Sequence, residues 1–192
     1  MIKRILYAIR QGWAYRKSLK RFLSQPQLQL ERLEHLTQDV IEAANIAVVA
    51  LDFDGVLAPH DADEPSMEAQ QWLQRLSIWI GEQRIAILTN KAKPERLRYF
   101  QQHFPGIQVV TGVAKKPYPD GIWEIANYRE IDPSRILLID DRLLTGMLAT
   151  CLAPCQARYF IKPISNYRAH CVLELFFNLL RQGERLLIKA IG

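Results

Sequence analysis

The chain has 192 residues, 49% of them hydrophobic, and a formal net charge of +5. This length fits one domain with extensions, and the apolar share is large enough for a complete core. No apolar run reaches the ~18 residues that a membrane-spanning helix needs. The first residues also lack the uninterrupted apolar stretch of a secretory signal peptide. The three cysteines form no C-x-x-C pair, so we expect them to be reduced, as in a cytoplasmic protein.

The charges are segregated along the chain. Residues 1–30 carry seven basic side chains and no acidic one, whereas residues 31–156 carry 12 basic and 18 acidic side chains. Residues 157–192 are basic again. An acidic central body argues against nucleic acid as a partner, because phosphate backbones bind basic surfaces.

The amino-terminal segment is predicted to be a basic amphipathic helix. Its apolar side chains recur at helical spacing, with Lys and Arg between them, at Ile2, Ile5, Leu6, Ile9 and Trp13. Such a helix is typical of a segment that lies on an anionic membrane surface. The alternatives are a helix that packs on the domain with a solvated basic face, and an organelle transit peptide. We therefore expect an arm over residues 1–28 and a protein that is cytoplasmic and peripheral to the membrane.

An apolar run over residues 46–51 predicts a buried strand that ends at two carboxylates, Asp52 and Asp54. Open parallel sheets place their reacting groups at the carboxyl ends of strands. Two carboxylates so close together need either a divalent cation or a shared proton. Both arrangements suit phosphoryl chemistry. A solvated turn is the plain alternative.

Residues 66–81 are predicted to form the helix that leads to the next parallel strand, over 85–88. That strand ends at Thr89 and Asn90, whose side chains can hydrogen-bond a phosphate oxygen, although they are also common turn residues. Further along, Lys116 precedes a proline, which holds it extended. Its ammonium can act as a fixed charge against a phosphate, or it can be an ordinary surface lysine.

A further predicted strand, over 136–139, ends in Asp140 and Asp141. A second carboxylate pair would complete a site for a hard cation such as Mg²⁺, or it would cap the helix that follows. With strands at 107–110 and 157–161, the pattern predicts an α/β fold. We expect a three-layer, Rossmann-like domain with a mainly parallel five-stranded sheet and right-handed crossovers.

The spacing of these segments excludes a sizeable cap domain. Only 34 residues separate Asp54 from Thr89, and 25 separate Asn90 from Lys116. These gaps are filled by the predicted helices and the strand at 107–110. An open site must exclude water by other means, for which a large substrate or a membrane surface could serve.

The four strand-end segments resemble the four motifs of the haloacid dehalogenase (HAD) superfamily. The resemblance implies a Mg²⁺-dependent phosphatase that forms an aspartyl-phosphate, with Asp52 as the nucleophile and Asp54 as the general acid and base. It implies that Thr89 and Asn90 bind the phosphoryl group and that Lys116 stabilises its charge. The metal ligands that it implies are Asp52, the carbonyl of Phe53, Asp54, Asp140 and Asp141.

Residues 116–146 and the carboxyl-terminal Arg-x-x-Glu-Arg pattern also resemble the phosphatidylglycerophosphate phosphatases of HAD subfamily IIIA. This resemblance implies a lipid phosphate head group as the substrate. The chain departs from the subfamily pattern, with Asp140 in place of a glycine, Arg142 in place of a glutamine and Gly146 in place of an aspartate. We expect Asp140 to substitute for the carboxylate missing at 146.

Other functions fit the same motifs. The chain could be a soluble phosphatase for a sugar, nucleotide or protein phosphate, a phosphotransferase, or a non-catalytic docking module with a phosphatase-like fold. The expected organisation is an arm (1–28), a phosphatase core (29–165) and a final helix (166–192) that packs on the core. The oligomeric state is left open.

Overall fold

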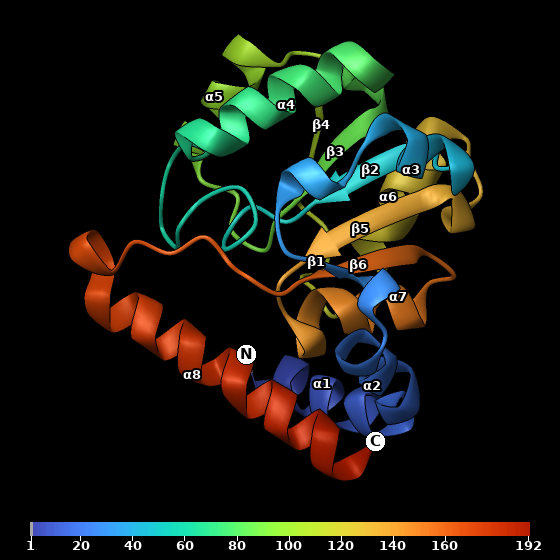
Figure 1. Ribbon diagram of the computed structural model, residues 1–192, viewed down its shortest axis with the longest axis vertical. Coiled ribbons are helices and arrows are strands. Elements are labelled where there is room, and N and C mark those ends of the chain that lie inside the picture. The colour runs from blue at the N-terminus through green and yellow to red at the C-terminus, as the bar shows by residue number, and fades with distance from the viewer. Residues whose placement is uncertain (1) are drawn as a thin grey trace.

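The computed structural model of the chain describes residues 2–192. Its centre is a single sheet of six parallel strands in the order β1-β6-β5-β2-β3-β4, with helices on both faces (Figure 1). The strands are β1 (Gln29–Leu30), β2 (Val48–Leu51), β3 (Ile85–Leu88), β4 (Gln108–Val110), β5 (Ile136–Asp140) and β6 (Gln156–Phe160). The predicted α/β class, parallel sheet and five strand positions are confirmed.

The sheet has one strand more than predicted. Strand β1 has only two residues, which pair with Tyr159 and Phe160 of β6 at the edge of the sheet. A strand of two residues is too short to produce an apolar run or an alternating pattern. Nothing in the sequence therefore distinguishes it from the loop around it.

The apolar run of β2 is explained by burial on both faces. Val49 and Leu51 face one core cluster, together with α3 (Gln38–Ala43), α4 (Met67–Ile80) and α5 (Pro94–His103). Val48 and Ala50 face the other, together with α6 (Asp120–Arg129) and α7 (Leu148–Leu152). Because successive side chains of a strand point to opposite faces, a strand covered on both sides has no polar position.

The predicted helix over 66–81 is α4, and its two ends have identifiable causes. The Ser66 hydroxyl accepts a hydrogen bond from the backbone N–H of Ala69 at 3.2 Å, which caps the helix. Gly81 ends it with a φ of 83°, a left-handed conformation that glycine adopts without strain.

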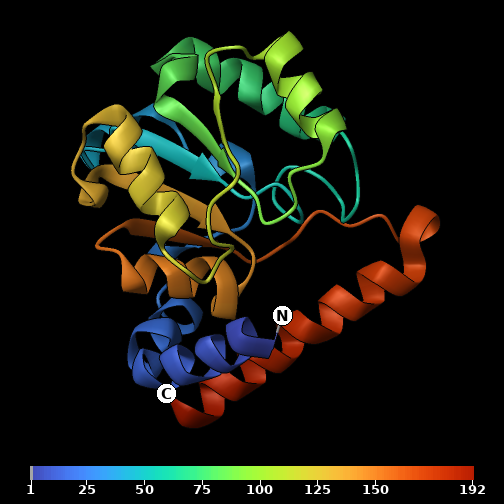
Figure 2. The ribbon, with the colours of Figure 1, turned by 180° about the vertical axis from the view of Figure 1, so that it is seen from behind.

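Three helices gather below the sheet, at the end of the molecule where both termini lie (Figure 2). They are α1 (Ile2–Ala14), α2 (Arg16–Ser24) and α8 (Tyr167–Ile191). Leu19 and Phe22 of α2 share a core cluster with Ile188 of α8 and Tyr159 of β6. Helix α2, which lies in the predicted arm, is therefore anchored to the core by this cluster. The predicted domain boundaries at residues 28 and 165 stay a proposal.

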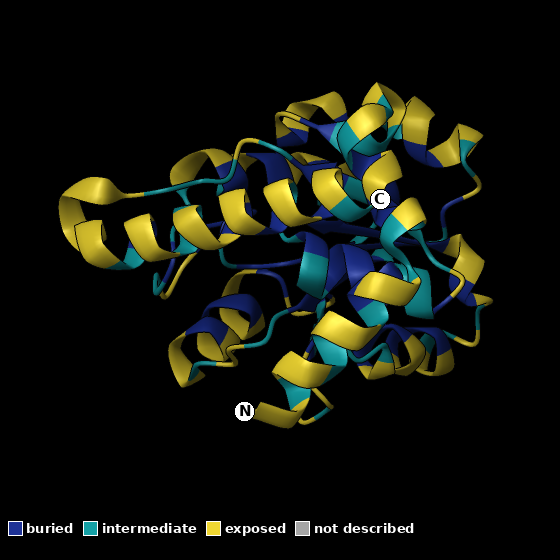
Figure 3. Cartoon of the chain, turned by 90° about the horizontal axis from the view of Figure 1, so that it is seen from below, coloured by how far each residue is buried: buried dark blue, intermediate teal, exposed yellow. Residues whose placement is uncertain are grey.

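Helix α8 is much longer than the surface that it covers. Exposed residues run along most of its length in Figure 3, and its first turns extend away from the body of the molecule. Several of its exposed side chains are large and apolar, among them Val172, Leu175, Phe176 and Leu179. Of residues 2–192, no helix combines the length and the hydropathy needed to cross a bilayer.

Candidate active site

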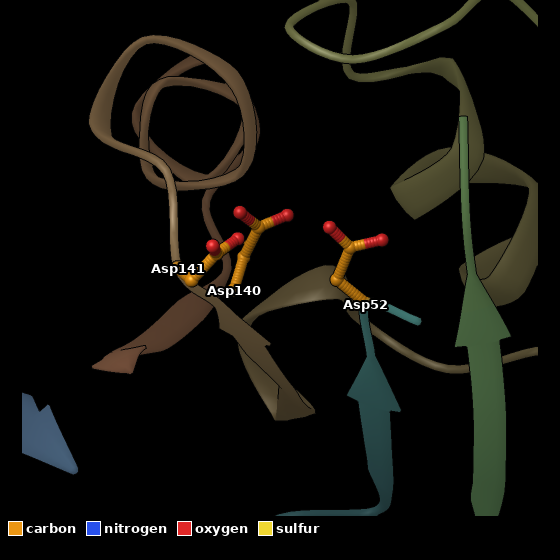
Figure 4. Close-up of side chains that lie close together, drawn as sticks. All are labelled: Asp52, Asp140 and Asp141. Carbon is orange, nitrogen blue, oxygen red and sulfur yellow. The ribbon is translucent and has the colours of Figure 1, made fainter. Parts of the chain in front are cut away.

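Three carboxylates meet at the carboxyl end of the central strands. Asp52 follows β2, Asp140 is the last residue of β5, and Asp141 comes next (Figure 4). Strands β2 and β5 are neighbours, with Leu51 opposite Ile139, so the residues that follow them lie side by side. One oxygen of each carboxylate lies within 4.8 Å of the other two, and all three side chains are buried.

Lys116 is the basic residue inside this cluster. Its ammonium lies 3.0 Å from Asp52 Oδ1 and also pairs with Asp140. Asn90 fixes the backbone that carries it: the Asn90 side-chain oxygen accepts from the Lys116 N–H at 2.7 Å, and its amide donates to the Lys116 carbonyl at 3.3 Å. Asn90 thus joins the end of β3 to the lysine segment. Thr89 lines a smaller neighbouring cavity of about 210 Å³ together with Asn90 and Lys116.

The electrostatics of the cluster follow from burial. Burial raises the pKa of Asp52 well above its usual range; Lys116 opposes this shift, and the neighbouring carboxylates add to it. Burial alone would lower the pKa of Lys116, but Asp140 and Asp52 outweigh it and raise that pKa. For Asp141, burial raises the pKa to about 6 against the opposing charge of Arg181. The cluster therefore holds more carboxylate than its two bases satisfy.

Asp141 shows most clearly that the cluster fits a cation. Its Oδ2 pairs with Arg181 of α8, a side chain only 2% exposed. Its Oδ1 is buried and has no hydrogen-bond partner among the described residues. A buried carboxylate oxygen without a donor is costly, and a hard divalent cation is the partner that three converging carboxylates suit. Asp52, Asp140 and Asp141 therefore fit a divalent metal ion.

Two predicted ligands lie outside the cluster. The carboxylate of Asp54 accepts two hydrogen bonds from Arg96 of α5, at 2.7 and 2.9 Å. The Arg96 guanidinium also stacks 4.0 Å above the Phe53 ring. The Phe53 carbonyl accepts from the N–H groups of Leu57 and Ala58, both at 3.0 Å, so both of its lone pairs are engaged inside the loop.

Two of the three departures from the subfamily pattern, Asp140 and Gly146, are neighbours in space. A Cβ atom built on Gly146 would lie 2.0 Å from Cγ of Asp140. Only glycine therefore leaves room for the Asp140 carboxylate, which sequence analysis expected to replace the missing one at 146. The contact supports that expectation. The chain lacks a carboxylate at 146 and has one at 140, and the two positions are adjacent in space.

Helix α8 supplies residues that sequence analysis did not connect to the site. Besides Arg181, its Glu184 accepts from Arg142 Nε at 2.9 Å and from the backbone N–H of Leu143 at 2.9 Å. These bonds hold the loop that follows Asp141. Arg96 and Arg181 were missed because each is 40 or more positions from its partner in sequence. The Arg-x-x-Glu-Arg pattern was the signal in the sequence for Arg181 and Glu184.

A cavity of about 640 Å³ opens above the carboxylates. Asp52, Asp54 and Asp141 are among its polar lining residues, and two helices provide most of its apolar lining. Helix α1 contributes Ile5, Ala8 and Ile9, and α8 contributes Leu173, Phe176, Phe177 and Leu180. The volume is within the range of small-molecule sites.

The family model described as mitochondrial PGP phosphatase matches residues 15–155, more than half of the chain. Curated proteins gave no match. Among solved structures, a hypothetical protein from Xanthomonas campestris is 19% identical with a TM-score of 0.50, covering 84% of this chain and 97% of its own. At this identity the likeness shows the fold.

Two further solved structures have known activities. The 3-deoxy-D-manno-octulosonate 8-phosphate phosphatase of Moraxella catarrhalis, in complex with magnesium, phosphate and KDO, is 15% identical; the match covers 82% of this chain and 100% of that one, with a TM-score of 0.44. The cobalt-bound deoxy-D-mannose-octulosonate 8-phosphate phosphatase of Haemophilus influenzae is 16% identical. The match covers 74% of this chain and 92% of that one, with a TM-score of 0.47. Because the family model matches more than half of the chain, the chain belongs to the mitochondrial PGP phosphatase family.

Proposed function

We propose that this phosphatase hydrolyses a lipid phosphomonoester, by resemblance phosphatidylglycerophosphate, through an aspartyl-phosphate on Asp52 and with Mg²⁺ as its cofactor. The observation that carries the proposal is the position of Asp52. It belongs to the buried carboxylate cluster, pairs with Lys116, and lines a cavity that also has apolar side chains from two helices.

The geometry of Asp52 supports its role as a nucleophile. Its Oδ1 is held by Lys116 and by the Phe53 N–H at 2.8 Å, so Oδ2 is the oxygen left to attack phosphorus. The attack forms a bond from Oδ2 to phosphorus and breaks the bond to the ester oxygen, which leaves with a proton. Water then attacks the phosphoryl group and releases phosphate, so the net reaction is hydrolysis.

Asp54 and Lys116 have the supporting roles. Asp54 is the proposed general acid and base, and the two hydrogen bonds from Arg96 fix the orientation of its carboxylate. Lys116 sets a positive charge beside the transferring group, and Asn90 holds the lysine backbone in place. Thr89 and Asn90 remain the proposed phosphoryl-binding side chains.

The cofactor is proposed from the donor set. Asp52, Asp140 and Asp141 would hold the cation, and oxygen-only ligands favour Mg²⁺. A bound cation neutralises negative charge on the phosphoryl oxygens. The buried Oδ1 of Asp141, which has no hydrogen-bond partner among the described residues, would gain one in such a cation.

The lipid and membrane parts of the proposal are supported by α1 and α8. Both helices line the cavity with apolar side chains, and both also expose large apolar residues to the outside. Helix α1 adds Lys3, Arg4 and Arg10, which suit an anionic surface. We therefore propose that the protein lies peripherally on a membrane, with the cavity mouth near the lipid. The expected cytoplasmic location, with an organelle as the alternative, stays a prediction.

Substrate choice is tested by phosphate release in Mg²⁺. Phosphatidylglycerophosphate in mixed micelles is compared with a soluble aryl phosphate, and Asp52→Asn is the control. We expect lipid turnover that is lost in Asp52→Asn. Turnover of the aryl phosphate alone would agree with phosphatase activity but contradict the lipid substrate.

Membrane attachment is tested by flotation on vesicles that contain anionic lipid. Ile2 and Leu6 of α1 are 71% and 61% exposed, and we expect Ile2→Gln with Leu6→Gln to reduce binding by about tenfold or more. The matched control is Met67→Gln with Ile78→Gln on α4, which removes two similarly exposed apolar side chains that do not line the cavity. Equal losses in the two double variants would contradict docking through α1.

A further inference from the structure

One basic side chain in the cavity lining is free of any carboxylate. Three basic residues line the cavity, and two of them are occupied: Lys91 pairs with Asp61, and Arg142 pairs with Glu184. The third is Arg4 of α1. Across residues 2–192 it has neither an ion-pair partner nor a side-chain hydrogen bond.

Asp52, Asp54 and Asp141 in the cavity lining each pair with a basic residue other than Arg4. Asp52 is paired with Lys116, as described above, and the carboxylates of Asp54 and Asp141 are held by arginines of α5 and α8. The charge of Arg4 is therefore available to a ligand. A cation that faces a cavity and lacks an internal partner favours an anionic group there.

Helix α1 holds Arg4 in a defined place. The Tyr7 ring stacks on Tyr118 with 4.3 Å between centroids, which joins α1 to the segment that carries Lys116. Further along, Gly12 lies so close to Leu144 that a Cβ atom would be 2.8 Å from its Cδ2. Arg4 lies three residues before Tyr7, on the same side of the helix.

The apolar lining lies beside this cation. Ile5 and Ile9 of α1 and Phe176 and Leu180 of α8 line the same cavity, so a ligand can meet a cation and an apolar wall at once. The cavity thus offers three environments: the carboxylate cluster with Lys116, the guanidinium of Arg4, and the apolar faces of two helices. A phosphomonoester alone uses only the first.

We propose that Arg4 forms a second subsite, which binds a second anionic group of the substrate. The inference rests on the proposed function, since it assumes that the phosphomonoester end is held at Asp52. The proposed substrate carries such a group, a phosphodiester, between its phosphomonoester end and an apolar portion that would lie against α1 and α8. Arginine suits this role because its guanidinium can donate two parallel hydrogen bonds to a phosphate. Helix α1 precedes the residues that the family model matches.

The test is steady-state kinetics on the full chain with two substrates. One is dihexanoyl phosphatidylglycerophosphate below its micelle concentration, which carries the diester; the other is an aryl phosphate, which does not. Monomeric lipid removes any effect of surface charge on vesicle binding. The variants are Arg4→Gln, Arg4→Lys and, as a matched loss of one exposed charge on α1, Arg10→Gln.

We expect Arg4→Gln to raise KM for the lipid by about 10- to 100-fold at nearly unchanged kcat, because a charged hydrogen bond is lost. The aryl phosphate should be hydrolysed as by the wild type, Arg4→Lys should recover part of the affinity, and Arg10→Gln should match the wild type. An unchanged KM for the lipid, or equal losses on both substrates, would overturn the subsite while the proposed function stands. Wild-type turnover of the aryl phosphate alone would overturn the lipid substrate and the subsite together.

Discussion

The contact between Gly146 and Asp140 makes a sharp prediction about stability. A Cβ atom at 146 would lie 2.0 Å from Cγ of Asp140. The Asp140 carboxylate cannot easily turn aside, because one oxygen pairs with Lys116 and the other accepts from the Arg142 N–H at 2.9 Å. Gly146→Ala must therefore either compress this contact or break a buried, charged hydrogen bond.

The expected magnitude follows from these two options. Overpacking of a filled core costs about 1–3 kcal/mol, and loss of a hydrogen bond to a charged group costs about 1.5–3 kcal/mol. We expect Gly146→Ala to lower the free energy of unfolding by about 3 kcal/mol. In an Asp140→Gly background the overlap is gone, and alanine should be neutral or stabilise the helix by up to about 1 kcal/mol. The coupling energy between the two sites is then about 3–4 kcal/mol.

Urea denaturation of the four proteins of this double-mutant cycle, in EDTA, measures the coupling. The chelator removes any contribution from cation binding to stability. Gly183→Ala in α8 is the control, because a Cβ atom there meets nothing within 4 Å. A cost for Gly146→Ala that is the same with and without Asp140 would refute the account of the fourth motif.

Three further predictions concern Arg96, Asp141 and the cap of helix α4. Arg96→Met should lower the free energy of unfolding by about 3 kcal/mol, since it leaves Asp54 unpaired; denaturation that matches the wild type would argue that the pair is not formed. Burial raises the pKa of Asp141 to about 6, and a cation binds its ionised form, so Mg²⁺ affinity should weaken as pH falls below about 6. Calorimetry between pH 5 and 7.5 checks this, and a flat profile would speak against Asp141 as a ligand. Ser66→Ala should cost about 1 kcal/mol, seen as a lower denaturation midpoint, because it removes the cap on α4.

The part of the fold that the sequence predicts is the part determined by local pattern. The β2 run is apolar at every position because both faces are buried, and the carboxylates stand where the strand ends. From parallel pairing alone, Asp52 and Asp141 were expected at one edge of the sheet. The meeting of Asp52, Asp140 and Asp141 in one buried cluster agrees with that reasoning.

The parts that could not be predicted depend on contacts between distant segments. Arg96 and Arg181 stand on helix faces whose pattern reads as solvated, yet each pairs with a carboxylate of another element. Likewise, the apolar stripes of α1 and α8 indicate amphipathic helices but not that they would share one cavity. Helical periodicity predicts which face of a helix is apolar, whereas tertiary packing determines which element that face contacts.

Rapid acid quench of stoichiometric enzyme with substrate in Mg²⁺, followed by peptide mass spectrometry, is the most direct test of Asp52 as the nucleophile. The account predicts a hydroxylamine-sensitive phosphoryl group on Asp52 within the first turnover, and no such group in Asp52→Asn. Full release of phosphate with Asp52 unmodified throughout, or a phosphoryl group on another residue, would contradict it.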